Sequence, residues 1–323
     1  MPTRRHVLTA TLAAPSVVGA ARAQGTGGPI RLVIPFATGG STDVIGRMVA
    51  DEMSRRLGQP VVPENRPGAG ATLGTGLVAR AAPDGTTLLL STISGLAIGH
   101  TLYRDRIQWD ADRDFAHVAM LFGTPYVLAV NPAFPARTLE ELVAESRRRP
   151  GGLDYATSGI GSVPHLLGLR LAQATGANLT HVPYRGGSQA ATDVVAGVVP
   201  ALLDGLAATA PLMKAASVRP LAMSSAERVP EFPEVPTFAE SGVPGATADG
   251  WAGIAAPAGT PRPVLERLAE AVRGALQTPA IQRRLAETAT GPGDRFLDDM
   301  QAYVRAEVAA WAPVVAQSGA RPE

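Results

Sequence analysis

The chain has 323 residues, of which 46% are hydrophobic and 18% charged, so it is long enough for two α/β domains and too apolar for a disordered chain. Its net charge of +1 gives no basic field for nucleic acid or anionic lipid, and 5% aromatic residues are too few to stack on single strands. The absence of cysteine excludes thiol catalysis, thiolate metal sites and disulfides. The histidines show no metal-ligand spacing, so we expect no metal, and because no cofactor motif stands out we expect no cofactor.

The N-terminus has the pattern of an export signal. Arg4-Arg5 precedes an apolar run that extends to Ala21, and an A-x-A cleavage motif ends at Ala23. The run is short and is interrupted by Pro15, so we do not expect it to span a membrane permanently. We predict that residues 1–23 are removed and that the mature protein is periplasmic. The paired arginines leave both a twin-arginine and a general secretory route open.

Strand-like and helical runs alternate along the rest of the chain, which is typical of α/β architecture with largely parallel sheets. We predict strands over Ile30–Phe36, Val61–Glu64, Thr87–Thr92, Val118–Phe122, Tyr126–Val130, Tyr155–Thr157, His181–Tyr184, Ala201–Leu203, Pro220–Ser224 and Trp251–Pro257. We predict helices over Val44–Leu57, roughly Ala71–Ala82, Leu139–Arg148, Val163–Thr175, Ser188–Ala196, Ala207–Ala216, Val264–Leu276 and from about Phe296 onward. Pro313 is expected to kink or end the last helix.

Two loops rich in Gly, Ser and Thr carry the functional signal. The loop Phe36–Thr42 follows the first strand, and Thr157–Ser162 follows a later one; each precedes a helix. The first N–H groups of a helix lack partners and favour negative charge, so such a loop holds an anion without Lys or Arg. One loop alone could be a tight turn with an N-cap. Two, at the carboxyl ends of strands, favour a site that clasps a small carboxylate.

Other residues allow a functional or a structural interpretation. His165 is either a ligand contact or a structural histidine, and Asp204 either binds water or an amine or caps a helix. Tyr184-Arg185 is either an ordinary turn or a ring and a cation at the edge of a cleft. We interpret Gly68–Gly74 as a structural turn, because its G-x-G-x-x-x-G pattern departs from the dinucleotide fingerprint. The three tryptophans are expected to be packing residues.

No catalytic motif stands out in the sequence. There is no G-x-S-x-G nucleophile elbow and no grouping of Ser, His and Asp, so we expect a protein that is not an enzyme. An exported hydrolase or nucleotide enzyme is kept as the alternative from another functional class; turnover of a bound compound would identify it.

The motifs, taken in order, resemble one family. They are Ile34–Asp43, Glu64–Gly70, Ala82–Gly85, Thr157–Ser162 with His165, His181–Gly186, Val235–Thr237 and Ala256–Pro261. The set covers nearly the whole mature chain and resembles the Bug-type receptors, the periplasmic solute-binding proteins of tripartite tricarboxylate transporters. The resemblance implies a two-lobed periplasmic-binding-protein fold of the Venus-flytrap type, type II. It also implies a monomeric receptor that captures a small organic carboxylate and delivers it to membrane transporter subunits.

The resemblance also implies which residues bind. In the first lobe these are Phe36, Ala37, Thr38, Gly39, Gly40, Ser41 and Thr42, with Ser91 and Thr92. In the second lobe they are Thr157, Ser158, Gly159, Gly161 and Ser162, with Tyr184 and Asp204, and His165 is kept as a candidate on the residue argument above. Leu203 and Gly205 flank Asp204 where the family usually has Phe and Asn, which leaves the identity of the ligand open.

Strand counting and the resemblance together predict how the lobes are divided. We expect the chain to cross between lobes near Thr124–Asn131 and to return near Asp249–Pro257. The first lobe would then comprise 24–125 plus 251–323, and the second 126–250. A receptor that signals to a membrane kinase when it closes remains the alternative among binding proteins.

Overall fold

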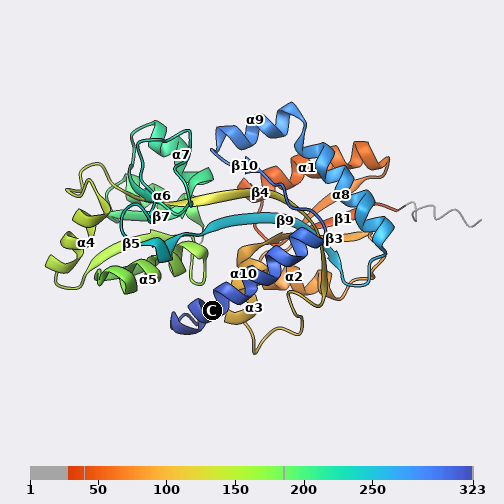
Figure 1. The fold of residues 1–323 in the computed structure, drawn as a ribbon, viewed down its shortest axis with the longest axis horizontal. Coiled ribbons are helices and arrows are strands. Elements are labelled where there is room, and N and C mark those ends of the chain that lie inside the picture. Colours follow the sequence, from red (N-terminus) through yellow and green to blue (C-terminus); the bar gives the residue numbers. More distant parts are fainter. Residues whose placement is uncertain (1–27, 40, 185, 322–323) are drawn as a thin grey trace, which may run out of the picture.

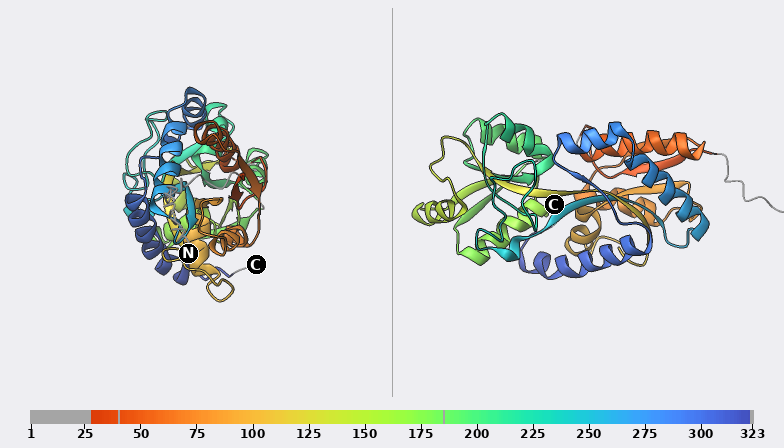
Figure 2. Two further views of the ribbon diagram at one scale, coloured as in Figure 1. Left: turned by 90° about the vertical axis from the view of Figure 1, so that its right-hand side faces the viewer. Right: turned by 45° about the horizontal axis from the view of Figure 1, so that its top comes forward.

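The computed structural model describes residues 28–39, 41–184 and 186–321. The predicted signal peptide (1–23), Gly40 and Arg185 lie outside these ranges. The described chain is elongated: a band of strands runs along the long axis, and helices cover it from both sides (Figures 1 and 2). Within these residues, the structure contains no helix of the length and apolarity that a membrane span requires.

Strands and helices alternate along the chain, as predicted. The strands are β1 (Ile30–Ile34), β2 (Val61–Asn65), β3 (Thr87–Thr92), β4 (Phe115–Val130), β5 (Leu153–Thr157), β6 (Leu179–Pro183), β7 (Ala201–Gly205), β8 (Arg219–Met223), β9 (Asp249–Pro257) and β10 (Gly291–Pro292). The α-helices are α1 (Ser41–Leu57), α2 (Thr72–Ala79), α3 (Gly99–Leu102), α4 (Leu139–Arg148), α5 (Val163–Thr175), α6 (Gly187–Val195), α7 (Leu206–Lys214), α8 (Arg262–Leu276), α9 (Pro279–Glu287) and α10 (Asp298–Gln317). Three short helices complete the fold: η1 (Ala69–Ala71), the π-helical η2 (Ser94–Ile98) and η3 (Pro244–Ala246).

The described strands form one sheet in the order β2-β1-β3-β9-β4-β7-β5-β6, with β8 and β10 paired to β4. At one end β1 pairs in parallel with β2 and β3, and at the other β5 pairs in parallel with β6 and β7. Between these groups, β9 and β4 are antiparallel to each other and to their outer neighbours. The long strands β4 and β9 therefore join the two ends of the molecule (Figure 1).

The predicted break in β4 is wrong. The sequence indicated two strands separated by Gly123-Thr-Pro125, but β4 is a single strand of 16 residues. Its partner β9 lies beside it from Phe115 to Pro125, and irregularities in the pairing absorb the local misfit. The fixed φ of proline is compatible with extended backbone, so pairing with β9 overrides the turn signal.

The predicted division into lobes cuts through these two long strands. Between Pro125 and Tyr126 the partners of β4 change, from β9 on one side to β7 and β8 on the other. The return at residue 251 falls inside β9. The division into 24–125 plus 251–323 and 126–250 stays a prediction, and we use it below to name the two sides of the molecule.

Apolar helix faces cover the first-lobe sheet. Ile45 and Val49 of α1 and Leu268 and Val272 of α8 are buried in one cluster with strand residues such as Leu32. Burial of a Leu or Ile side chain contributes about 1.5–3 kcal/mol, so these helix faces hold the scaffold of the cleft in place. Trp109, Trp251 and Trp311 are 6%, 3% and 3% exposed, which confirms that they are packing residues.

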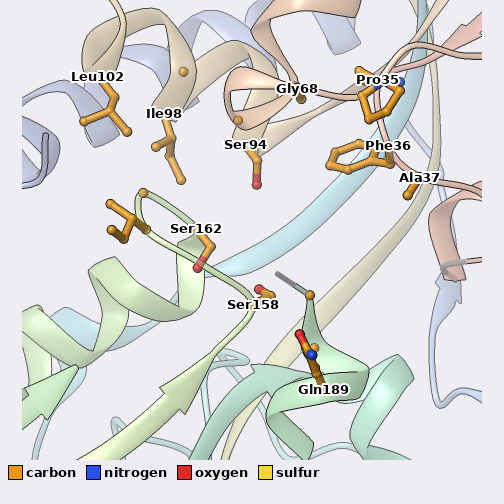
Figure 3. Close-up of a pocket in the computed structure, with 18 of the residues that line it drawn as sticks. Pro35, Phe36, Ala37, Gly68, Ser94, Ile98, Leu102, Ser158, Ser162 and Gln189 are labelled. Carbon is orange, nitrogen blue, oxygen red and sulfur yellow. The ribbon is translucent and has the colours of Figure 1, made fainter. Parts of the chain in front are cut away.

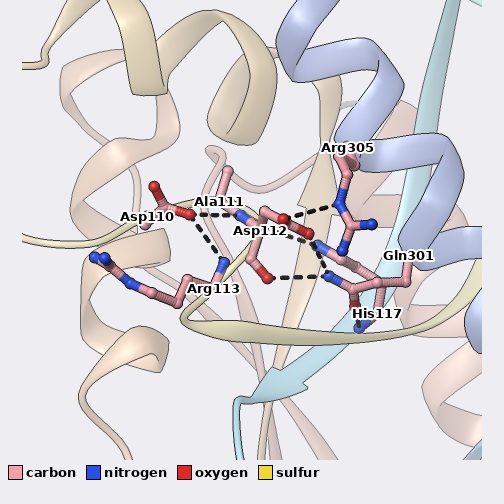
Figure 4. A network of polar contacts seen from close by, with 7 residues as sticks. All are labelled: Asp110, Ala111, Asp112, Arg113, His117, Gln301 and Arg305. Atoms are coloured by element: carbon pink, nitrogen blue, oxygen red, sulfur yellow. Dashed lines mark hydrogen bonds and ion pairs between the residues drawn. The ribbon is translucent and has the colours of Figure 1, made fainter.

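The sequence predicted that Pro313 kinks or ends the last helix; the helix does not end there but continues to Gln317. Trp311 and Val315 on either side are buried, and their packing outweighs the hydrogen bond that proline cannot make. Figure 4 shows how α10 is fixed to the rest of the first lobe. Gln301 accepts from the N–H of His117 at 3.1 Å and donates to Asp112, which also pairs with Arg305 at 2.9 Å.

Candidate functional site

A cavity of about 830 Å³ lies between the loops that follow β1 and β5 (Figure 3). The first-lobe residues that line it are Pro35, Phe36, Ala37, Thr38, Gly39, Pro67, Gly68, Gly70, Ala71, Ser94, Ile98, Gly99, Leu102 and Tyr103. The second-lobe residues are Ser158, Ile160, Gly161, Ser162, Gly186, Gly187, Ser188 and Gln189. This volume lies within the range of about 300–1,000 Å³ that is typical of small-molecule sites. None of these lining residues carries a charged side chain.

The first-lobe loop is held from below by a buried carboxylate. Asp43 accepts the N–H of Gly39 at 2.9 Å, a bond from Arg47 at 3.0 Å and one from Asn65 at 2.7 Å. Burial would raise the pKa of Asp43, but these hydrogen bonds together lower it below its ordinary value. The N–H of Gly39 is therefore occupied. Those of Ala37 and Thr38 find no hydrogen-bond partner in the part of the chain that the structure describes.

In the second-lobe loop, alternate backbone N–H groups donate hydrogen bonds to groups of the loop and of α5. Gly159 donates to Thr157 Oγ1 at 3.2 Å, and Gly161 donates to His165 Nδ1 at 3.1 Å. Ser162 caps α5 by accepting the N–H of His165, and its hydroxyl donates to the carbonyl of Gly159 at 2.7 Å. The N–H groups of Ser158 and Ile160 have no partner among the described residues. Two backbone donors thus remain for a ligand on each side of the cavity.

Two stacked histidines support this second loop from behind. The rings of His165 and His181 lie 4.0 Å apart and 16° from parallel, and His181 Nε2 is 2.7 Å from Thr157 Oγ1. Burial lowers the pKa of His165, and burial together with His165 lowers that of His181 to about 4. Both rings are neutral at neutral pH. His165 can then accept from Gly161, so it positions the loop without lining the cavity.

Asp204 lies directly beneath the cavity. It is 6% exposed, its Oδ2 has no hydrogen-bond partner among the described residues, and a Cβ on Gly187 would lie 1.8 Å from that oxygen. Burial raises the pKa of Asp204 to about 6, although hydrogen bonds from Gly205 and Ser158 oppose the shift. Asp204 is not part of the lining, whereas Ser158 and Gly187, which contact its carboxyl group, are.

Comparison with known sequences identifies the family to which this chain belongs. Residues 45–320 match the family model described as "Tripartite tricarboxylate transporter family receptor". The chain belongs to this family. It is accordingly a solute-binding receptor of the periplasmic-binding-protein fold and not an enzyme.

Individual relatives of this transporter receptor agree with the family. It is 37% identical over 294 residues to protein BugT of Bordetella pertussis, covering 91% of this chain and 90% of BugT. A solved R. palustris protein with adipate has a TM-score of 0.82 at 34% identity, over 91% of this chain and 98% of that one. MatC from Rhodopseudomonas palustris with bound malate has a TM-score of 0.80 at 33% identity, over 89% and 98%.

The receptor brings together about half of the predicted binding residues. Those that line the cavity are Phe36, Ala37, Thr38, Gly39, Ser158, Gly161 and Ser162. Thr42, Thr157, Gly159 and His165 lie in or beside the two loops but outside the lining. Ser41 begins α1, and Gly40 is outside the described residues.

Three further predicted residues are not part of the lining. Ser91 and Thr92 are buried in β3, where they pair with Gly253 and Ala252 of β9. The hydroxyl of Tyr184 donates to Asp193 at 2.7 Å and does not reach the lining. Whether these three residues contact a ligand stays a prediction.

The receptor's cavity also has walls that sequence reasoning missed. Gly68 and Gly70 have φ of +132° and +60°, so the segment is the structural turn that we expected, but its surface forms part of the lining. Ser94, Ile98 and Leu102 come from η2 and α3. The glycines at 68 and 70 were the available signal for the turn. The π-helix has none.

Proposed function

We propose that this protein is a monomeric periplasmic receptor that closes its two lobes on a small organic carboxylate and delivers it to the membrane subunits of a tripartite tricarboxylate transporter. We propose further that it is exported by the leader 1–23 and begins at Gln24. The ligand carboxylate would accept hydrogen bonds from the N–H groups of Ala37 and Thr38 on one side and of Ser158 and Ile160 on the other. The hydroxyl of Thr38 completes this set, because the hydroxyls of Ser158 and Ser162 already donate to Asp204 and to the carbonyl of Gly159.

The observation that carries the proposal is the set of unpartnered donors around a cavity whose described lining has no charge. Backbone N–H groups in a closed cleft bind an anion more strongly than in water, because the site is desolvated. The adipate and malate bound to the two R. palustris relatives belong to the same chemical class. They support a carboxylate ligand here.

The test is calorimetry of the mature protein, from Gln24, against a panel of aliphatic, aromatic, C4 and C6 carboxylates and citrate. We expect at least one acid to bind and to be recovered unchanged. A ligand at 100 times its Kd would also stabilise the fold by about 2.7 kcal/mol. If no acid in the panel binds to protein that mass spectrometry shows to be empty, the proposal is wrong.

A pair of glycine variants ties binding to the second loop. Gly159 has φ of +135°, and a Cβ there would lie 3.2 Å from the carbonyl of Tyr184. Gly159→Val should therefore displace the donors of Ser158 and Ile160 and weaken binding at least 100-fold. Gly151→Val is the matched control, because Gly151 has φ of +94° at the opposite end of β5, with nothing within 4 Å of its Cβ position.

Both valine substitutions place a β-branched residue at positive φ, which costs about 1–3 kcal/mol of stability. Only Gly159→Val should change the Kd. Equal affinities in the two variants would remove the loop Thr157–Ser162 from the site.

A further inference from the structure

One end of the cavity is apolar. Ile98 and Leu102 lie at the end opposite Pro35, Phe36 and Ala37 (Figure 3); Ile98 is almost fully buried, at 1% exposed, and Leu102 is half-buried. Ile160 of the second lobe is also part of the lining, and it is one of the few large apolar side chains exposed among the described residues, at 36%. An exposed isoleucine on a binding loop is accounted for if the ligand covers it.

The two lobes meet at this apolar end. A Cβ on Gly161 would lie 2.3 Å from Cδ2 of Leu102, so the leucine side chain reaches across the cleft to the backbone of the second-lobe loop. Ligand atoms placed between Leu102, Ile98 and Ile160 would be enclosed by both lobes. Apolar atoms gain from that enclosure, whereas a charged group loses its water without receiving a partner.

The charge around the cavity opposes a second carboxylate. None of the lining residues that the structure describes is Lys, Arg or His, and Arg185, next to Gly186 of the lining, is outside the described residues. The carboxyl group of Asp204 lies behind Ser158 and Gly187 and adds negative potential to the second-lobe wall. A second anionic group at the end formed by Ile98, Leu102 and Ile160 would be desolvated without a cationic partner, and the negative potential of Asp204 would oppose it.

We propose that the ligand of this receptor carries a single carboxylate, held by the two loops, and an apolar body that fills the end formed by Ile98, Leu102 and Ile160. This inference rests on the proposed function and narrows it to amphipathic monocarboxylates, aliphatic or aromatic. The three apolar side chains would then select the ligand by its apolar body. The backbone donors of the loops cannot do so, because they contact only the carboxylate.

Hexanoate and adipate give a matched comparison, because they have the same chain length and differ only in the far end. Calorimetry of the mature protein should show hexanoate binding at least tenfold more tightly than adipate. From butyrate to hexanoate the affinity should rise about fourfold per methylene, the factor expected when one CH₂ is buried. Adipate binding as tightly as hexanoate or more so would overturn the inference and leave the proposed function standing. If no acid binds, both are overturned.

Two variants test the apolar end itself. Ile160→Asn and Leu102→Asn change side chains that are not fully buried, so the fold should survive. Each should weaken hexanoate about tenfold and change adipate less than threefold. Val198→Asn is the control, because Val198 is 70% exposed and is not part of the lining; both affinities should equal those of the wild type. An unchanged hexanoate-to-adipate ratio in both Asn variants would overturn the inference.

Discussion

The carboxyl group of Asp204 is buried beside the lining of the cavity. Its pKa is about 6 in the folded protein, against 3.8 for an unperturbed aspartate, because it is buried. A raised pKa means that the folded state holds the proton more tightly than the unfolded state. This contribution to stability is fully present below pH 4 and is lost as the pH rises through 6. The difference of about two units corresponds to roughly 3 kcal/mol.

Asp204→Asn should remove this pH dependence. The stability of the variant relative to the wild type should increase between pH 4 and pH 7.5 by up to about 3 kcal/mol, because the variant cannot acquire the buried charge. Urea unfolding at pH 4, 5.5 and 7.5 measures the difference. The histidines titrate in both proteins and cancel. A difference that is constant over this range would mean that Asp204 is not perturbed in the fold.

At the scale of residues, the sequence predicted the polar part of the site and not the apolar part. Runs such as Ala37-Thr-Gly39 and Ser158–Ser162 have a local signature, because glycine permits the turn and hydroxyls accompany it. Ile98 and Leu102 have no such signature. An apolar residue that lines a cavity looks in the sequence like one in the core, and only packing separates the two.

At the scale of elements, the junction between the second loop and α5 depends on His165. We predict that His165→Leu leaves the N–H of Gly161 buried without an acceptor and shifts the loop, which weakens carboxylate binding about tenfold. His165→Asn should keep affinity within about threefold of the wild type, because the amide can present an oxygen close to the position of Nδ1. Titration calorimetry on both variants decides between loop positioning and simple ring packing. If Asn and Leu weaken binding equally, the hydrogen bond to Gly161 is not what positions the loop.

The predictions for whole elements succeeded where their signals were local. Helices α4 and α5 have the predicted bounds: Thr138 and Ser162 cap their first turns, and Gly176 ends α5 in a left-handed conformation. β4 was predicted wrongly because Pro125 is a turn signal in the sequence, whereas pairing with β9, more than a hundred residues away, keeps it extended. Long-range pairing cannot be read from a single sequence window.

At the scale of the whole molecule, the two ends are joined by continuous structure. β4 and β9 run through both ends. Helix α10 lies along the first lobe, and the guanidinium of Arg170 from α5 lies 5.3 Å from the centre of the ring of Trp311 in α10. Closure of the lobes would bend these long elements rather than move a loose linker. The contact between Leu102 and Gly161 then limits how closely the two lobes can approach each other.

This contact yields a prediction about closure. In Gly161→Ala the new Cβ would lie 2.3 Å from Cδ2 of Leu102, and alanine at φ of +72° adds about 1–2 kcal/mol of strain. The lobes should stop short of full closure, so ligand affinity should fall more than tenfold and the ligand-induced decrease in the radius of gyration should shrink. Leu102→Ala removes the obstructing atoms and, with them, part of the apolar wall, so alone it should weaken binding by a smaller factor.

The double variant separates steric closure from local strain. If the leucine is what meets the new methyl group, Gly161→Ala with Leu102→Ala should bind at least fivefold more tightly than the sum of the single effects predicts, a coupling of about 1 kcal/mol. The strain at φ of +72° is present with or without Leu102, so it cancels in the cycle. Additive effects on Kd, with full compaction in small-angle X-ray scattering of the liganded Gly161→Ala protein, would show that the lobes close without this contact. Ligand capture would then depend on the polar loops alone.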